Sequence, residues 1–160
     1  MTPALLGTSG PIPVFQNPDE SIVWTGMANS DEDGGIHAYH PGDTGLDTVR
    51  DAKDQNGNWC GIVLDVDGRP IIQGPGDPAP GYFISCTSYQ LPQYAQNDPR
   101  RYLNAEAIPY AVVPGWLRRA CRGVLMGCYG ELLNLDTGDM VQVMTGDIGP
   151  RVGEYSCAAL

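Results

Sequence analysis

The sequence has few basic residues and no long apolar run. Only 9 of its 160 residues are Lys or Arg, against 19 Asp or Glu, which gives a formal charge of -10 and a pI near 4.3. Affinity for phosphates depends on Lys and Arg, so no nucleic acid partner is expected. No stretch approaches the length of a membrane span, and no signal peptide is visible at the N-terminus. We therefore expect no membrane partner, and secretion only if a leader has been removed.

Cysteine is present, but not in the pattern of a metal or redox site. The cysteines are odd in number and contain no Cys-x-x-Cys pair, so at least one thiol stays free unless it pairs between chains. We expect mostly buried thiols in a reducing compartment, and no metal or cofactor. The five cysteines are Cys60, Cys86, Cys121, Cys128 and Cys157.

Glycine and proline are abundant instead. The chain has 21 Gly and 14 Pro, which favours many short segments joined by turns over a helical bundle. Its length suits one domain with a hydrophobic core. The negative charge lies mainly in the first 80 residues, which hold 12 acidic and 3 basic residues, against 7 and 6 in the second half. A cationic ligand is therefore the expected type of partner.

The order of the segments predicts a mainly β fold. Residues 1–20 contain four prolines and several glycines, which predicts an extended arm, and residues 21–160 are expected to form a single β-rich domain. The acidic cluster at 31–35 is interpreted as a solvated loop. We expect a small barrel or sandwich of about six to eight strands, with the double-psi barrel as one candidate, and few short helices. Strands are expected at 21–25, 59–66, 70–72, 82–89, 108–114, 124–126, 129–135 and 140–145, and helical turns at 45–53, at 116–122 and after Gly153.

The stretch from Thr145 to Ser156 combines two carboxylates with a turn. Asp147 ends an apolar strand, Gly149-Pro150 redirects the chain, and Glu154 opens the last segment. Such a turn lets both acids face one cleft. Paired carboxylates of this kind perform glycoside hydrolysis, in which one protonates the leaving oxygen and the other activates water or attacks the sugar. The spacing alone equally fits a turn aspartate and a glutamate at a helix N-terminus.

Four stretches resemble, in their order along the chain, the pattern of glycoside hydrolase family 75, the endo-chitosanases. They span residues 60–157, roughly the last two-thirds of the chain, and four motifs in order are far more specific than one. The stretches are Leu64-Asp65-Val66-Asp67-Gly68, Asp77-Pro78-Ala79-Pro80-Gly81-Tyr82 leading to Thr87-Ser88, Arg101 to Tyr110 with Val113-Pro114, and Gly146-Asp147-Ile148-Gly149-Pro150 with Gly153-Glu154.

The resemblance implies an activity and a catalytic pair. Members of this family hydrolyse β-1,4-linked glucosamine polymers with inversion, using an Asp and a Glu in the last motif. These correspond to Asp147 and Glu154, and the implied partner is chitosan, a cationic polysaccharide that the acidic first half would attract. Two assignments remain open: Glu154 as the general acid with Asp147 as the base, and the reverse.

Five further residues are candidate substrate contacts. Asp65 and Asp67 are candidates for binding sugar ammonium groups, although an Asp-Gly hairpin turn explains them equally. Their Asp-Val-Asp-Gly stretch also resembles the start of a calcium loop, but the later ligands are missing. Tyr82 and Tyr102 are candidates for stacking on sugar rings, with a core position as the alternative. Arg151 lies inside the proposed catalytic loop, where it would pair with a carboxylate.

Two other functions remain as alternatives. Family members continue past the last motif through a helix and a strand, whereas this sequence ends six residues after Glu154. The domain would then be truncated, or obtain the element from another chain in a homo- or hetero-oligomer. One alternative is therefore a non-catalytic structural or carbohydrate-binding module in a larger assembly. The other is a peptidoglycan-cleaving relative with a similar barrel.

Overall fold

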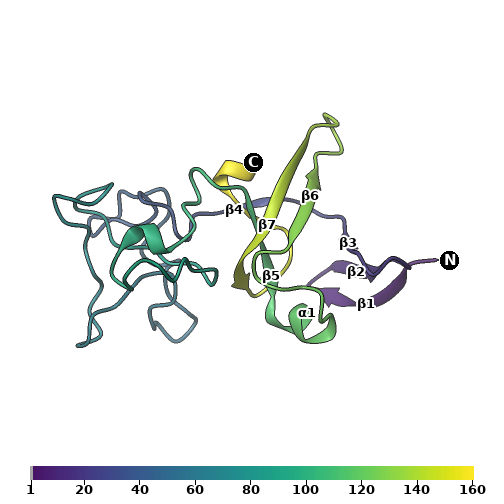
Figure 1. The fold of residues 1–160 in the computed structure, drawn as a ribbon, viewed down its shortest axis with the longest axis horizontal. Helices are drawn as coiled ribbons and strands as arrows, with labels where there is room; N and C mark the ends of the chain where they lie inside the picture. Colours follow the sequence, from purple (N-terminus) through teal and green to yellow (C-terminus); the bar gives the residue numbers. More distant parts are fainter. Residues whose placement is uncertain (1) are drawn as a thin grey trace.

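The computed structural model describes residues 2–160 and is mainly β, as predicted. Its strands form a five-stranded sheet in the order β4-β8-β5-β7-β6 and a three-stranded sheet in the order β1-β2-β3, and these do not close into a barrel within the described residues. Figure 1 shows the five-stranded sheet between the three-stranded sheet and a long loop-rich region. The strands are β1 (Ala4–Ser9), β2 (Ile12–Gln16), β3 (Ile22–Trp24), β4 (Asn29–Asp31), β5 (Tyr110–Pro114), β6 (Tyr129–Leu133), β7 (Met140–Gly149) and β8 (Glu154–Ser156).

The helices are short. They are α1 (Gly115–Ala120) and two 3-10 turns, η1 (Pro99–Arg101) and η2 (Cys157–Ala159). No helix within residues 2–160 has the length and apolar character to cross a bilayer. The helical turn predicted at 116–122 is confirmed by α1.

Strand β5 is the centre of the five-stranded sheet. All five of its residues are buried, as an apolar run closed by prolines predicts. β7 runs parallel to β5, with a bulge that brings Asp147 opposite Val112. β8 lies on the other side of β5 and pairs in parallel with β4, while β6 forms an antiparallel hairpin with β7. The two strands of the candidate catalytic stretch therefore flank the best-buried strand of the molecule.

The first 20 residues are not the extended arm that was predicted. Residues 4–16 form the β1–β2 hairpin, and β3 adds a third strand. Val14 is fully buried and packs with Val152 and with α1 in one hydrophobic cluster. The prediction failed because Pro11 and Pro18 lie in turns, where a missing N–H breaks no ladder hydrogen bond.

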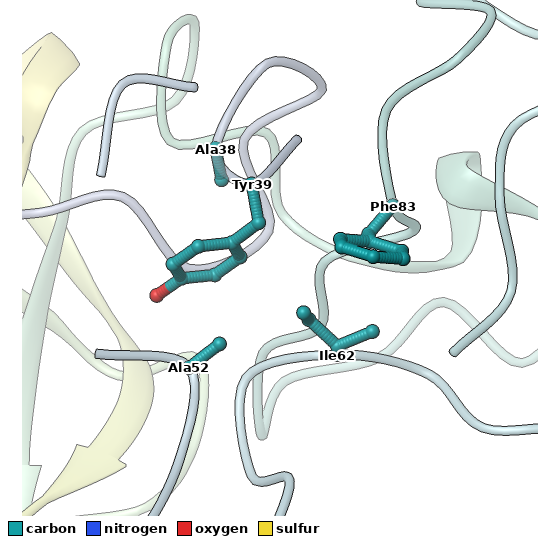
Figure 2. Packing of buried hydrophobic residues seen from close by; sticks show 5 residues of the cluster. All are labelled: Ala38, Tyr39, Ala52, Ile62 and Phe83. Carbon is teal, nitrogen blue, oxygen red and sulfur yellow. The ribbon is translucent and has the colours of Figure 1, made fainter. Parts of the chain in front are cut away.

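Residues 32–109 form the loop-rich region. The strands predicted at 59–66, 70–72 and 82–89 contribute isolated bridges in place of continuous ladders. Backbone hydrogen bonds still connect the three segments: the N–H of Val63 donates to the carbonyl oxygen of Ile84 at 2.9 Å, and the N–H of Ile71 donates to that of Val63 at 3.0 Å. The region nevertheless has a small core of its own, shown in Figure 2. This core consists of Ala38, Tyr39, Ala52, Ile62 and Phe83.

Further local predictions are corrected by tertiary context. Residues 45–52 and 124–126 form turns, bends and irregular backbone, and Lys53 forms an isolated bridge with Trp59. The segment after Gly153 begins as strand β8 and becomes helical only at η2, because backbone pairing with β4 and β5 outweighs its local helical propensity. All five cysteines are free, and only Cys121 is buried, so the prediction of mostly buried thiols is wrong. Cys60 is exposed, and Cys86, Cys128 and Cys157 are partly buried.

Candidate active site

Asp147 and Glu154 lie on the same face of the five-stranded sheet. On β7, Asp147 and Gly149 are two positions apart and therefore point to the same side. A Cβ atom placed on Gly149 would lie 3.0 Å from Oε2 of Glu154, so the Glu154 carboxylate lies over Gly149 on that side. The structure thus brings together the two residues predicted as the catalytic pair.

Two glycines allow the tight turn between β7 and β8. Gly153 has a φ of 95°, and a side chain there would meet a backbone carbonyl oxygen at 2.9 Å. A Cβ on Gly149 would lie only 2.6 Å from Cγ1 of Val112. Between them, the exposed Arg151 places its Nε atom 2.8 Å from Oε1 of Glu154. The turn therefore both bends the chain and supplies a cationic partner for Glu154.

Asp147 is buried, with 7% of its surface exposed. Its Oδ1 atom accepts hydrogen bonds from the backbone N–H of Ser88 (2.9 Å), the backbone N–H of Ile148 (2.6 Å) and the hydroxyl of Ser88 (2.5 Å). Burial raises the pKa of Asp147, and the negative charge of Glu154 adds to the rise, while the three hydrogen bonds oppose it. The net effect is a carboxyl that holds its proton to a higher pH than an exposed aspartate.

A third carboxylate, Asp31, lies on the same side of the sheet. In the parallel pairing of β4 and β8, Asp31 is opposite Ser156, which is two positions from Glu154 and points to the same side. We call the sheet side with Asp31, Asp147 and Glu154 the acidic face. It faces the loop-rich region, because Ser88 of that region contacts Asp147.

The acidic segment 31–35 is therefore not the solvated loop that was predicted. The hydroxyl of the fully buried Tyr110 donates to the carbonyl oxygen of Asp33 at 2.6 Å and lies 3.3 Å from Oδ2 of Asp31. The hydroxyl of Tyr39 donates to Oδ1 of Asp33 at 2.8 Å. Tyr39 is a near neighbour of Asp33 in the sequence, whereas Tyr110 is 77 positions away, and together they hold the segment between the sheet and the loop-rich region.

The carboxyl groups between the sheet and the loop-rich region have raised pKa values. Burial raises the pKa of Asp31 to about 7, and the charges of Asp147 and Glu154 contribute. Burial, together with the charge of Asp31, raises the pKa of Asp33 well above its usual range. Within residues 2–160, no group of three or more His, Cys, Asp or Glu side chains is arranged to hold a metal ion. Carboxyl groups with raised pKa values on one face can donate and accept protons, and in their ionised form they attract cations.

Arg151 is the predicted substrate contact that the structure places beside the catalytic pair. Tyr102 is instead a core residue, only 5% exposed, packed with Val63 and Ile84. Its hydroxyl donates to the backbone carbonyl of Gln96 at 2.8 Å. The prediction that Tyr102 stacks on a sugar is wrong, because the faces of its ring are covered by the protein.

Asp65, Asp67 and Tyr82 lie in the loop-rich region, outside the five-stranded sheet. Oδ1 of Asp65 accepts hydrogen bonds from the backbone N–H groups of Asp67 and Arg69, both at 2.9 Å, which is the hairpin-turn role. Asp67 is exposed, and its Oδ2 atom lies 3.5 Å from Nη1 of Arg69. Tyr82 is partly buried, edge-on to His37 with 5.0 Å between ring centroids. A substrate contact by any of these three stays a prediction.

Two surface depressions also lie in the loop-rich region. One, of about 390 Å³, is lined by residues between 50 and 57, and the other, of about 290 Å³, is lined by Asp65 and its neighbours. Neither is lined by Asp147 or Glu154. The acidic face therefore lies outside both depressions.

Sequence reasoning missed several residues of the acidic face. Asp31 and Asp33 were assigned to a loop because their segment is polar and rich in glycine, and no apolar pattern marks Asp31 as the end of strand β4. Ser88 ends one of the four motifs, but nothing in the sequence connects it with Asp147, 59 residues away. Contacts over such separations are not visible in a single sequence.

Comparison with known proteins finds no family model and no curated protein that matches this chain. Its function is therefore inferred from the acidic face and from the four sequence motifs.

Proposed function

We propose that this chain is an endo-acting chitosanase, which hydrolyses β-1,4-linked glucosamine polymers with inversion of configuration. The main support is that Asp147 and Glu154 share one sheet face in unlike environments. Asp147 is buried and hydrogen-bonded by uncharged donors, whereas Glu154 is paired with the guanidinium of Arg151. Two carboxyl groups in different environments are what the acid and the base of one glycosidase site require.

Asp147 is the general acid in this proposal. Its raised pKa keeps the carboxyl protonated to a higher pH than an exposed aspartate, as a general acid requires. The three hydrogen bonds converge on Oδ1, which leaves Oδ2 to carry the proton. The proton passes from Oδ2 to the glycosidic oxygen while the bond between that oxygen and C1 of the sugar breaks.

Glu154 is the general base. Its ion pair with Arg151 matches a carboxylate that is charged before the reaction. It removes a proton from a water molecule whose oxygen attacks C1 on the side opposite to the leaving oxygen. The new bond to C1 then has the inverted configuration, and each carboxyl ends in the protonation state that the other began with.

The charge of the protein supports a cationic substrate. The net charge is -10, and the first 80 residues, which hold most of the excess, include Asp31 of the acidic face. Chitosan carries ammonium groups at acidic pH, where its amines are protonated. Long-range attraction would raise its concentration near the face and speed its association, most strongly at low salt.

One observation favours the non-catalytic alternative. β6 is an edge strand of the five-stranded sheet, and four apolar residues between positions 129 and 140 of the β6–β7 hairpin are exposed. The exposed fractions are 85% for Tyr129, 49% for Leu133, 70% for Leu135 and 60% for Met140. Edge strands with exposed apolar side chains are common sites of contact with other chains. The exposed apolar residues of this hairpin are therefore those expected of a module that multimerises through the hairpin and cleaves no polysaccharide.

The deciding experiment measures the release of reducing ends from chitosan, chitin and peptidoglycan side by side. Asp147→Asn and Glu154→Gln should each lower kcat on chitosan by at least about 100-fold, the usual effect of removing a general acid or base. Asp139→Asn removes one charge from an exposed hairpin turn and should keep the parental rate. Parental activity in both catalytic-site variants would refute the assignment, and cleavage of peptidoglycan alone would indicate the cell-wall alternative.

The stereochemistry can be tested separately. NMR of the first product should show the α-anomer, because inversion converts the β-linkage. A β-anomer would mean retention, and would contradict the roles given to Asp147 and Glu154 even if the protein cleaves chitosan.

A further inference from the structure

Ser88 joins the loop-rich region to the acidic face. It lies outside the sheet, yet its N–H and its hydroxyl both donate to Oδ1 of Asp147. The next residue, Tyr89, donates its backbone N–H to the carbonyl oxygen of Gly146 at 2.9 Å. The segment around Ser88 is therefore attached to β7 at two successive points, one of which is the candidate catalytic carboxyl.

The segment around Ser88 is itself fixed by hydrogen bonds of the buried Thr87. The hydroxyl of the buried Thr87 donates to the carbonyl oxygen of Tyr89 at 2.8 Å and accepts from the backbone N–H of Leu103 at 3.1 Å. Ser88, by contrast, is exposed. An exposed residue thus donates its hydroxyl to a buried carboxyl, while the residue before it in the chain is fixed by buried contacts.

The contacts divide the two oxygens of Asp147. Oδ1 receives three hydrogen bonds, which use its lone pairs fully, and no residue in 2–160 donates to Oδ2. A proton on the carboxyl is therefore carried by Oδ2. Two of the donors are backbone N–H groups, and the Ser88 hydroxyl is the single side-chain donor of the set.

We propose that Ser88 is the positioning residue of Asp147, holding Oδ1 so that Oδ2 presents its proton to the glycosidic oxygen. This inference rests on the proposed function. A small rotation of the carboxyl would move Oδ2 out of line with the breaking bond, and general acid catalysis depends on hydrogen-bond distance and alignment. Ser88 acts through Asp147 and requires no contact with the reacting atoms.

The role predicts a signature in the pH dependence of the reaction. The Ser88 hydroxyl bond stabilises the ionised form of Asp147 and so lowers its pKa against the effect of burial. Ser88→Ala removes this bond but keeps the backbone N–H donor. The pKa of Asp147 then rises, and since the acid must be protonated to work, the alkaline limb of the kcat/KM profile moves to higher pH.

Three variants of the full chain test the proposal. Ser88→Ala should lower kcat about 10- to 100-fold with KM within about 3-fold, and should shift the alkaline limb upward. Ser88→Thr keeps the hydroxyl at an exposed position with room for a methyl group, and should recover most of kcat and the parental limb. Ser85→Ala is the matched control, because it removes a buried hydroxyl of the same region that bonds the backbone of Gly34 and Gly61. It should lower the melting temperature and leave the alkaline limb of the kcat/KM profile unchanged.

The outcomes separate this proposal from the proposed function. An inactive parental protein overturns the chitosanase assignment. An active parent with an unchanged pH limb in Ser88→Ala, or with Ser88→Thr no better than Ser88→Ala, overturns the role of Ser88 alone. A 13C NMR titration of the Asp147 carboxyl reports on the contact without turnover: its pKa should rise in Ser88→Ala, and an unchanged titration refutes the proposal.

Discussion

Asp31→Asn should change how the stability of the protein depends on pH. A carboxyl whose pKa is higher in the folded than in the unfolded chain holds its proton longer in the folded state. The free energy of unfolding therefore falls as pH rises from about 4 to about 7, the interval between the ordinary value of 3.8 and the raised pKa of Asp31 near 7. Asparagine cannot ionise, so the variant loses this part of the pH dependence.

The size of the effect follows from the raised pKa. At about 1.4 kcal/mol for each pKa unit, the interval from 3.8 to about 7 corresponds to roughly 4 kcal/mol. Asp31 remains partly exposed, so solvent screening reduces this figure, and we expect about 2 kcal/mol. For a domain of this size, that difference is about 4 to 8 °C in melting temperature.

The assay is urea unfolding followed by tryptophan fluorescence at pH 4.5 and pH 8. The loss of stability between these two pH values should be about 2 kcal/mol smaller in Asp31→Asn than in the parent. Asp139→Asn, which removes an equal charge from an exposed turn, should keep the parental difference. An equal loss of stability in the parent and in Asp31→Asn would refute the burial of a carboxylate at this position.

Three more substitutions separate the site from the scaffold. Gly149→Ala should cost about 1 to 3 kcal/mol of stability, because the new methyl group collides with Val112, and it should abolish chitosan hydrolysis, because the same group displaces Glu154. Unfolding curves measure the first effect and activity kinetics the second. Arg151→Gln should change the unfolding free energy by less than about 1 kcal/mol, since the pair is exposed on the arginine side, yet lower kcat by releasing Glu154. Tyr102→Leu should destabilise the fold by about 2 kcal/mol or more and leave KM for chitosan unchanged; a raised KM would restore its predicted sugar contact.

The sequence predicted the sheet elements better than the loop-rich region. The run at Tyr110–Pro114 and the hairpin of β6 and β7 were recognisable because their apolar residues fill continuous strands and a turn lies between them. The segments at 59–66 and 82–89 have the same β-forming residues. Their neighbours pair with them at single residues only, and the extent of pairing depends on partners that a single sequence does not specify.

For the candidate site, the sequence by itself determined the local chemistry: an acid, a Gly-Pro turn and a second acid, in a chain with a large negative charge. These properties depend on residue type and short spacing, so they can be seen without a structure. Only the tertiary structure decided which other groups reach the pair. Asp31, from a segment interpreted as solvated, joins the acidic face through the pairing of β4 with β8, and Ser88 reaches Asp147 across 59 positions. Tyr102 is taken into the core by the same packing. Burial and long-range hydrogen bonds set the pKa of a carboxyl and the direction in which its proton points, and both arise only when distant parts of the chain meet.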